Sequence, residues 1–196
     1  MSIRSGISER ARAYVEIPYN DGFNINDGIT LAAWVKIDHL PLATAYTGII
    51  NAKKTNYGPY LLQTSILNGL NVYEFSVYIK GAWDWNISKT EESTDWVHLV
   101  GTYDGDTSRI YVNGKLDAEK VLGGKIDDNT EEGVTIGHFY GLAGRWFNGL
   151  IDEVAIYNLA ISADKVKELY QGATLLKAVD PKSKVVATWG ELKARY

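Results

Sequence analysis

Two tryptophans separated by one residue form the strongest candidate ligand site in this sequence. Residues 81–86 read Gly-Ala-Trp-Asp-Trp-Asn, and in an extended chain Trp83 and Trp85 project on the same side. Asp84 and Asn86 add a carboxylate and an amide that can hydrogen-bond hydroxyl groups. Because an aromatic ring beside such groups suits a sugar, we expect an aromatic loop that binds carbohydrate. Packing of the two rings at the rim of the domain explains the same pattern, and this alternative stays open.

A second aromatic stretch, residues 138–147, reads His-Phe-Tyr-Gly-Leu-Ala-Gly-Arg-Trp-Phe. Its glycines interrupt the regular pattern, and Tyr140, Arg145 and Trp146 supply two rings and one cation. Loops that a rigid scaffold positions commonly carry recognition. We therefore add these three residues to the candidate ligand site.

Strands are the elements that must position these residues. Segments of alternating apolar and polar residues are separated by clusters of Gly, Asn, Asp and Pro. The predicted strands are residues 13–17, 29–37, 48–52, 60–64, 72–80, 96–103, 109–112, 134–136 and 150–157. Many short strands at this spacing indicate an all-β sandwich or barrel. One face of residues 29–37 is wholly apolar, so this strand should face the core, with Trp34 on the other side of its sheet.

One segment near the C-terminal end of this pattern has a helical period. Ser162 can cap it, and Val166, Leu169 and Tyr170 share a face at spacings of three and four residues. We expect a single domain over residues 1–172. Residues 173–196 then form an extension or linker that docks on the domain or joins it to a partner.

Composition excludes several classes of function. The 196 residues suit one domain, and the absence of cysteine excludes disulfides and thiolate metal sites. A formal net charge of -4 gives no basic footprint, so we expect no nucleic-acid partner. No apolar run approaches the roughly 20 residues that span a bilayer, and the first residues lack the apolar core of a signal peptide. We therefore expect no membrane insertion, and neutral partners or calcium fit better.

Two longer motifs carry a family resemblance. Residues 96–116 read WVHLVGTYDGDTSRIYVNGKL, and residues 148–157 read NGLIDEVAIY. With Tyr-Val-Glu-Ile-Pro at 14–18 and the strand at 29–36, they resemble the laminin-G-like and pentraxin-like jellyrolls of the concanavalin A-like lectins and glucanases. The resemblance implies a two-sheet antiparallel jellyroll sandwich with one short helix near the C-terminus. Many pentraxin-like members carry a cysteine pair that is absent here, and cysteine-free relatives are common in bacteria, so we expect a bacterial source.

The same resemblance implies a structural calcium ion. In related sandwiches an aspartate at the position of Asp152 binds the ion, and hard oxygen ligands suit calcium. The alternative is that Asp152 only accepts hydrogen bonds from main-chain amides at a strand end. Two acidic turns, residues 104–106 and 127–129, lack the ligand spacing of a calcium-binding loop, so we interpret them as ordinary turns.

Catalytic patterns are absent from the sequence. No motif pairs His98 with a nucleophile or an acid, so we expect a buried imidazole with satisfied hydrogen bonds. The glucanase branch of the family carries Glu-x-Asp-x-x-Glu on one strand, whereas residues 91–95 here read Glu-Glu-Ser-Thr-Asp. There is also no nucleophile elbow, zinc motif or phosphate-binding glycine loop. We therefore expect that the protein is not an enzyme.

These observations predict a non-catalytic binding module that recognises a glycan or glycoprotein through rim loops or the concave sheet, with a structural calcium ion. The alternative is a structural or adhesion module that binds another protein. A glycosidase with an unrecognised carboxylate pair is a more distant third possibility. We expect an extracellular or cell-surface location as part of a larger protein, although fold alone does not determine function.

Overall fold

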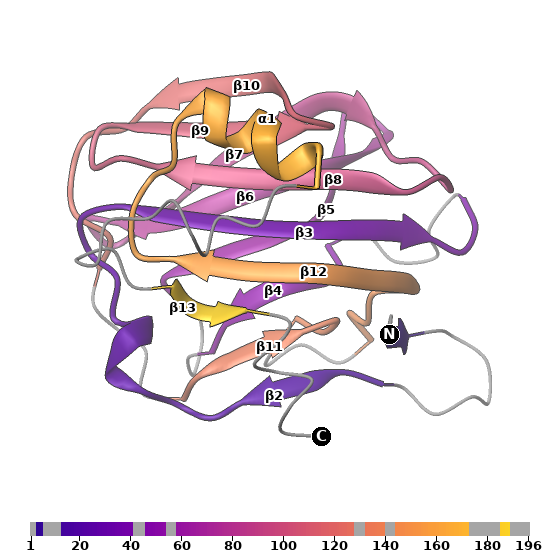
Figure 1. Cartoon of the computed structure of the whole chain (residues 1–196), viewed down its shortest axis with the longest axis horizontal. Coiled ribbons are helices and arrows are strands. Elements are labelled where there is room, and N and C mark those ends of the chain that lie inside the picture. The colour runs from indigo at the N-terminus through magenta and orange to yellow at the C-terminus, as the bar shows by residue number, and fades with distance from the viewer. Residues whose placement is uncertain are drawn as a thin grey trace.

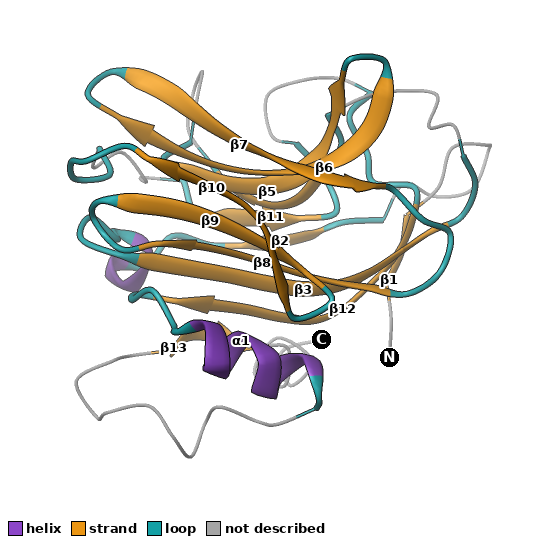
Figure 2. Ribbon diagram, turned by 90° about the horizontal axis from the view of Figure 1, so that it is seen from above, coloured by secondary structure: helices purple, strands orange, loops and turns teal. Residues whose placement is uncertain are grey.

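The computed structural model describes residues 3–5, 13–40, 46–53, 58–127, 132–139, 144–172 and 185–188. In these ranges the strands form two antiparallel sheets that pack face to face, and one short α-helix lies on the outer face of one sheet (Figure 1, Figure 2). The predicted all-β, two-sheet jellyroll sandwich is confirmed. None of the helices in these ranges is long and apolar enough to cross a membrane.

The first sheet has the strand order β1-β12-β3-β8-β9-β10, and β13 also pairs with β12. Its strands are β1 (Ile3–Ser5), β3 (Ile29–Ile37), β8 (Val97–Tyr103), β9 (Thr107–Val112), β10 (Lys115–Val121), β12 (Gly149–Tyr157) and β13 (Val185–Thr188). β1 and β13 share one edge of β12, because β1 pairs with residues 149–151 and β13 with residues 155–157. Part of the segment 173–196 is therefore a strand of this sheet.

The second sheet has the strand order β2-β11-β4-β5-β6-β7. Its strands are β2 (Val15–Ile17), β4 (Gly48–Ala52), β5 (Tyr60–Leu67), β6 (Leu70–Ile79), β7 (Ala82–Glu91) and β11 (Val134–Ile136). A short 3-10 helix, η1 (Asp21–Phe23), lies between β2 and β3 in the chain. β7 is one edge of this sheet, and of its outward side chains Trp85 and Lys89 are exposed whereas Trp83 and Ile87 are half-buried.

The hydrophobic core fills the space between the two sheets. The apolar face predicted for residues 29–37 lies in this core, where each of its side chains is at most 1% exposed. Across the core, the ring of Phe75 packs directly against Gly101 of β8. A Cβ atom at residue 101 would lie 2.2 Å from that ring, so only glycine fits the present packing.

The α-helix α1 (Ala163–Tyr170) covers the outer face of the first sheet (Figure 2). Ser162 caps it as predicted, because its side chain accepts a hydrogen bond from the main-chain N–H of Lys165. Val166 is fully buried against the sheet. Trp34 stacks on Tyr170 of the helix at 5.7 Å between ring centroids, so Trp34 lies on the other side of its sheet, as predicted.

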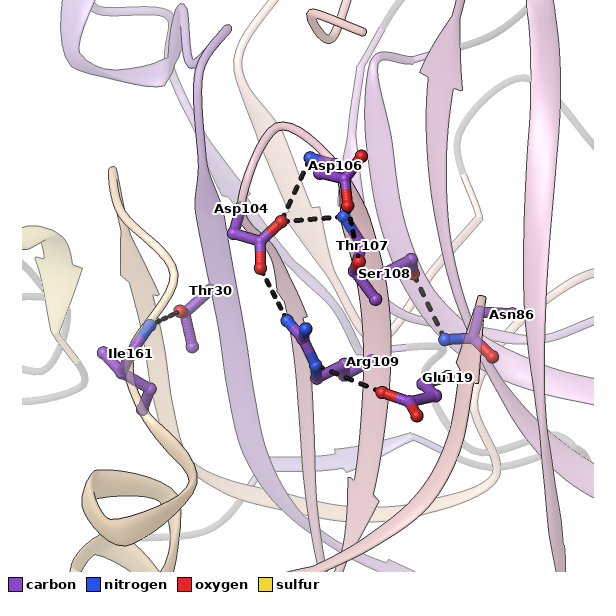
Figure 3. Close-up of polar contacts among 9 residues, drawn as sticks. All are labelled: Thr30, Asn86, Asp104, Asp106, Thr107, Ser108, Arg109, Glu119 and Ile161. Carbon is purple, nitrogen blue, oxygen red and sulfur yellow. Dashed lines mark hydrogen bonds and ion pairs between the residues drawn. The ribbon is translucent and has the colours of Figure 1, made fainter. Parts of the chain in front are cut away.

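Thr30 ties the segment before this helix to β3 (Figure 3). Its hydroxyl donates to the carbonyl of Leu159 at 2.7 Å and accepts from the main-chain N–H of Ile161 at 3.0 Å. A single side chain on the central strand therefore fixes the path into α1.

The predicted strand bounds agree with the structure at β3, β4 and β11. At each of the other predicted strands they differ by at most a few residues. The sequence did not predict β10. The expectation of a loop at residues 81–86 is wrong, because Lys80 and Gly81 make a tight turn and β7 begins at Ala82. This correction matters, because β7 carries the two candidate tryptophans.

Candidate ligand-binding face

The outer face of the second sheet presents Trp83 and Trp85 side by side. Tyr73, Phe75 and Val77 of β6 belong to the core, so the residues between them point outward. On the neighbouring strand Trp85 pairs with Ser76, and Trp83 pairs with Tyr78. Because paired residues share a face, both tryptophans point outward, and we name this outer surface the tryptophan face.

The two rings differ in their exposure. Trp85 is 60% exposed, a larger exposed fraction than that of any other tryptophan or tyrosine among the described residues, where Tyr14 follows at 41%. Trp83 is half-buried and meets Tyr78 edge to face at 5.5 Å between centroids. The hydroxyl of Tyr78 donates to the carbonyl of Gly81, which fixes this ring at the turn. Trp85 is therefore an open platform beside a supported pair of rings.

Asp84 and Asn86 lie on the opposite face of β7 from the tryptophans. Asp84 forms an ion pair with Lys120 of β10. Asn86 is 3% exposed and donates to the hydroxyl of Ser108 in β9 at 3.2 Å (Figure 3). The expectation that these two residues join the tryptophans in one loop site therefore needs correction. The segment is a strand, and successive side chains of a strand point to opposite faces of the sheet.

A buried polar network lies on β5 and β6, on the same outer face as the two tryptophans. One carboxylate oxygen of Glu74 accepts from the amide of Gln63 at 3.0 Å and from the hydroxyl of Ser76 at 2.7 Å. Glu74 is 2% exposed, and this burial raises the pKa of its carboxyl, an effect that the hydrogen bonds from Ser76 and Gln63 only partly oppose. The network ties β5 to β6 on the outer face of the sheet.

His138 and Phe139 lie on the same side of the second sheet. Gly48 pairs with Gln63, and a Cβ on Gly48 would lie 2.6 Å from the main chain of His138. The hydroxyl of Thr135, in β11, also donates to the carbonyl of His138 at 2.9 Å. The two tryptophans of β7 and His138 of the second stretch therefore lie on the same side of one sheet. β4 and β7 are three strand spacings apart, or about 14 Å.

Trp146 belongs to a cluster of rings at the β2 side of this face. It stacks on His138 at 3.9 Å between centroids and meets Tyr14 edge to face at 5.2 Å. Tyr14 is 41% exposed, and sequence reasoning did not select it. Its position immediately before the first strand of this sheet is the signal that could have found it.

Arg145 is held between two other rings. Its Cζ atom lies 5.2 Å from the ring centroid of Tyr46 and 5.5 Å from that of Phe139. These are cation–π contacts, and they hold the guanidinium between the two rings. Tyr140, the remaining candidate from this stretch, lies outside the described residues.

Asp152 lies on the outer face of the first sheet, where it pairs with Trp34. Its Oδ1 atom accepts a hydrogen bond from the main-chain N–H of Glu153 at 2.9 Å. The ladder between β12 and β3 is irregular at this point, and Glu153 has a φ of 49°. The carboxylate therefore supports a bulge in β12.

The side chains around Asp152 do not by themselves fit a calcium ion. In the part of the chain that the structure describes, no three His, Asp or Glu side chains come close enough together to hold a metal. Calcium takes six to eight oxygen ligands, so an ion here would depend on main-chain oxygens for most of them. Calcium at Asp152 stays a prediction.

The other acidic turns are occupied by hydrogen bonds from the protein. Asp104 accepts main-chain N–H groups of Asp106 and Thr107 through Oδ1, and it pairs with Arg109 through Oδ2 at 2.6 Å (Figure 3). Burial alone would raise the pKa of Asp104, but the bonds from Arg109 and the main chain outweigh it and lower that pKa. Asp127 accepts N–H groups from the turn at residues 80–81. Residues 128 and 129 lie outside the described ranges.

His98 is buried, as predicted, but its hydrogen bonds are not all satisfied. The rings of Trp34 and Tyr170 lie 5.0 and 6.0 Å from its own centroid. Burial lowers the pKa of His98 to about 4. Its Nδ1 atom is buried with no hydrogen-bond partner in the described part of the chain.

Comparison with known families agrees with this architecture. Residues 9–167 match a laminin-G family model described as the concanavalin A-like lectin/glucanases superfamily. The match covers most of the chain, so the protein belongs to this superfamily. A search of curated proteins finds no match.

Solved structures with the same fold include several binding domains. A "putative carbohydrate binding protein" from Bacteroides ovatus has a TM-score of 0.67 and 23% identity, over 90% of this chain and 48% of that one. Domain 4 of AbnA, a GH43 extracellular arabinanase from Geobacillus stearothermophilus, solved with arabinotriose, has a TM-score of 0.61 and 17% identity over 87% of each chain.

A third similar structure is the heptameric SAP-like pentraxin from Limulus polyphemus. It has a TM-score of 0.61 and 13% identity, over 85% of this chain and 79% of that one. The present chain spans about half the length of the Bacteroides protein. At these identities the likeness shows only that the fold is shared.

Proposed function

We propose that this protein is a non-catalytic carbohydrate-binding module whose ligand lies on the tryptophan face. The observation that carries the proposal is the open ring of Trp85, 60% exposed on the outer face of an edge strand. This ring lies on the same face as Trp83 and Tyr78, so the three form an aromatic surface, and an aromatic face packs well against the C–H side of a sugar ring. The likeness to sugar-binding domains supports this assignment.

The immediate surroundings of Trp85 suit such a ligand. Tyr78 and Trp83 hold each other on the same face, so these two rings lose little conformational freedom when a ligand binds. The network around Glu74 ties the neighbouring strand β6 to β5 on the same outer face. A rigid aromatic surface of this kind binds without the cost of ordering a loop.

The absence of catalysis is part of the proposal. The glycosidase alternative requires two carboxyl groups that face the ligand, one as an acid and the other as a nucleophile or base. Glu74 is the buried carboxyl of this face, and its described hydrogen bonds engage it with Gln63 and Ser76. Release of reducing sugar from polysaccharides by the purified protein would contradict this part of the proposal.

Tryptophan substitution tests the binding site. Screening on a glycan array, followed by calorimetry on the best ligand, should give an affinity that Trp85→Ala weakens by at least about tenfold, because a stacked ring is lost. Trp96→Ala is the matched control, since Trp96 is 39% exposed but precedes β8 of the other sheet. Equal losses in both variants, or an array with no bound glycan, would contradict the proposal.

A protein partner is the second candidate function, and a different surface favours it. The turn between β5 and β6 exposes Ile66, Leu67 and Leu70 to 40%, 38% and 48%. Three aliphatic side chains at a hairpin tip form a small apolar patch of the kind that marks contact sites. A glycoprotein ligand would use both surfaces, whereas an adhesion module would use this tip alone.

We also propose an extracellular or cell-surface setting within a larger protein. The description of the Geobacillus relative as extracellular and the greater length of the Bacteroides protein support this setting. A reading frame that continues beyond these residues and encodes an export signal would agree with it. Detection of the protein only in the cytoplasm of its source would contradict it.

A further inference from the structure

Arg145 and Arg109 differ in the groups that their guanidinium contacts. Arg109 pairs with the carboxylate of Asp104 (Figure 3). In the described part of the chain, Arg145 forms no ion pair, and its guanidinium contacts the rings of Tyr46 and Phe139 instead. Aromatic rings attract a cation but accept no strong hydrogen bond in the guanidinium plane, so the N–H donors of Arg145 have no strong protein acceptor there.

The main chain fixes Arg145 as firmly as the rings do. The carbonyl of Arg145 accepts N–H groups from Phe139 at 3.1 Å and from Gly48 at 3.5 Å. A half-buried arginine that is held by its main chain and by ring contacts at its guanidinium loses little freedom when a ligand arrives. This arrangement resembles a prepared site more than a mobile surface charge.

Tyr46 adds a second and independent sign of function. Its φ is 62°, in the left-handed region that a bulky residue rarely occupies. Its ring is 37% exposed, so burial of the ring does not account for the strained conformation. Strain of this kind persists where the surrounding structure enforces it, and it concentrates at ligand-binding positions. Here the strained backbone directs the ring of Tyr46 onto Arg145.

We propose that Arg145 binds an anionic group of the ligand, and that the module recognises an acidic glycan carrying a carboxylate or a sulfate ester. A guanidinium matches either group with two parallel N–H donors. This inference rests on the proposed glycan-binding function and specifies its substrate class. It also explains how a protein with a formal net charge of -4 holds an anion, because the attraction is local and partly shielded from water.

A paired glycan array tests this substrate class. Each acidic oligosaccharide, as uronic acid or as sulfate ester, is printed beside its neutral counterpart, and the best pair is then titrated by calorimetry. We expect the acidic member to bind at least about tenfold more tightly, since charge-assisted bidentate bonds are worth this much. Comparison of the uronic acid and sulfate arms then identifies which anion the site prefers. The preference should weaken as salt concentration rises.

Substitutions separate recognition from net charge and from folding. Arg145→Gln should remove the preference for the acidic member while leaving the neutral counterpart unaffected, and Arg145→Lys should restore only part of it, because the fork is lost. Lys167→Gln makes the same charge change on the exposed side of α1, beyond the other sheet, and should change nothing.

Tyr46→Gly distinguishes a role of Tyr46 in binding from a role in stability. Glycine accepts the φ of 62° without strain, so the melting temperature should hold or rise. Binding of the acidic ligand should nevertheless weaken about threefold or more, because the supporting ring is gone. A fall in both stability and binding would assign Tyr46 to the fold and remove it from the site.

The outcomes distinguish this inference from the function on which it rests. Binding that depends on Trp85 but is equal for acidic and neutral glycans, and unchanged in Arg145→Gln, would overturn the anion site and leave the carbohydrate module standing. Absence of any glycan binding would overturn both. Acidic binding that depends on Arg145 and not on Trp85 would keep the anion site and move the rest of the ligand away from Trp85.

Discussion

At the bulge of β12, the carboxylate of Asp152 holds the main-chain N–H of Glu153 at 2.9 Å. Glu153 has a φ of 49°, which is unfavourable for a residue with a Cβ atom. We expect Asp152→Ala to lower the free energy of unfolding by about 1 kcal/mol, because this hydrogen bond is lost. Asp152→Asn keeps an acceptor and should lose less. Urea unfolding of the two variants measures the difference.

The same residue decides the calcium prediction. If calcium binds through Asp152, a chelator lowers the melting temperature of the wild-type protein and has no effect on Asp152→Ala, because a ligand that binds only the folded state stabilises it. Equal melting temperatures with calcium and with chelator would leave Asp152 with its role in the bulge alone. This experiment needs no knowledge of the remaining ligands.

At the scale of the elements, β8 and β6 pack directly against each other across the core at Gly101 and Phe75. Gly101 has no positive φ, so alanine fits the backbone, and only packing opposes it. We expect Gly101→Ala to lower the free energy of unfolding by about 1–3 kcal/mol, the usual cost of an overfilled core. Thermal or urea unfolding would measure this loss.

A double substitution provides the control for that prediction. Phe75→Leu alone should destabilise the protein, because the buried ring leaves a cavity. In the double variant, leucine gives the new methyl group room, so the two losses should be less than additive. Strict additivity would mean that the ring of Phe75 does not oppose a side chain at residue 101.

Sequence pattern predicts those strands that bury one face. Ile29–Ile37 was predictable to the residue, because every second side chain enters the core. β10 was not, since Lys115–Val121 is an edge strand with no fully buried residue, and it therefore has no apolar period. β1 and β13 have three and four residues, too few for any period to appear.

The candidate site was predictable in part for a related reason. The spacing of Trp83 and Trp85 is enough to place both rings on one face, whether or not the strand is recognised. The same alternation sends Asp84 and Asn86 to the other face, a consequence that is hidden when the segment is taken as a loop. The contacts of Arg145 with Tyr46 and Phe139 depend on tertiary structure, and no local pattern contains them.

At the scale of the whole molecule, two buried ionisable groups oppose each other as pH changes. Burial lowers the pKa of His98 to about 4, so the stability that its neutral form contributes is present above its ordinary pKa of 6.5 and is lost as pH falls. Burial raises the pKa of Glu92 to about 8. The stability that its protonated form contributes is present below its ordinary pKa of 4.5 and is lost as pH rises toward 8.

Glu92 gives the stronger prediction of the two, because no hydrogen bond from the described residues stabilises its ionised form. It is 7% exposed, and neither carboxylate oxygen has a hydrogen-bond partner in the described part of the chain. Glu92→Gln cannot ionise, so relative to wild type it should gain stability between pH 5 and pH 8, by an amount on the order of a few kcal/mol. Urea unfolding at several pH values measures this gain.

Glu91→Gln removes the same charge from an exposed neighbour and should leave the wild-type profile unchanged. If the two variants keep the same pH profile, Glu92 is ionised in the folded protein and finds a partner that the described residues do not supply.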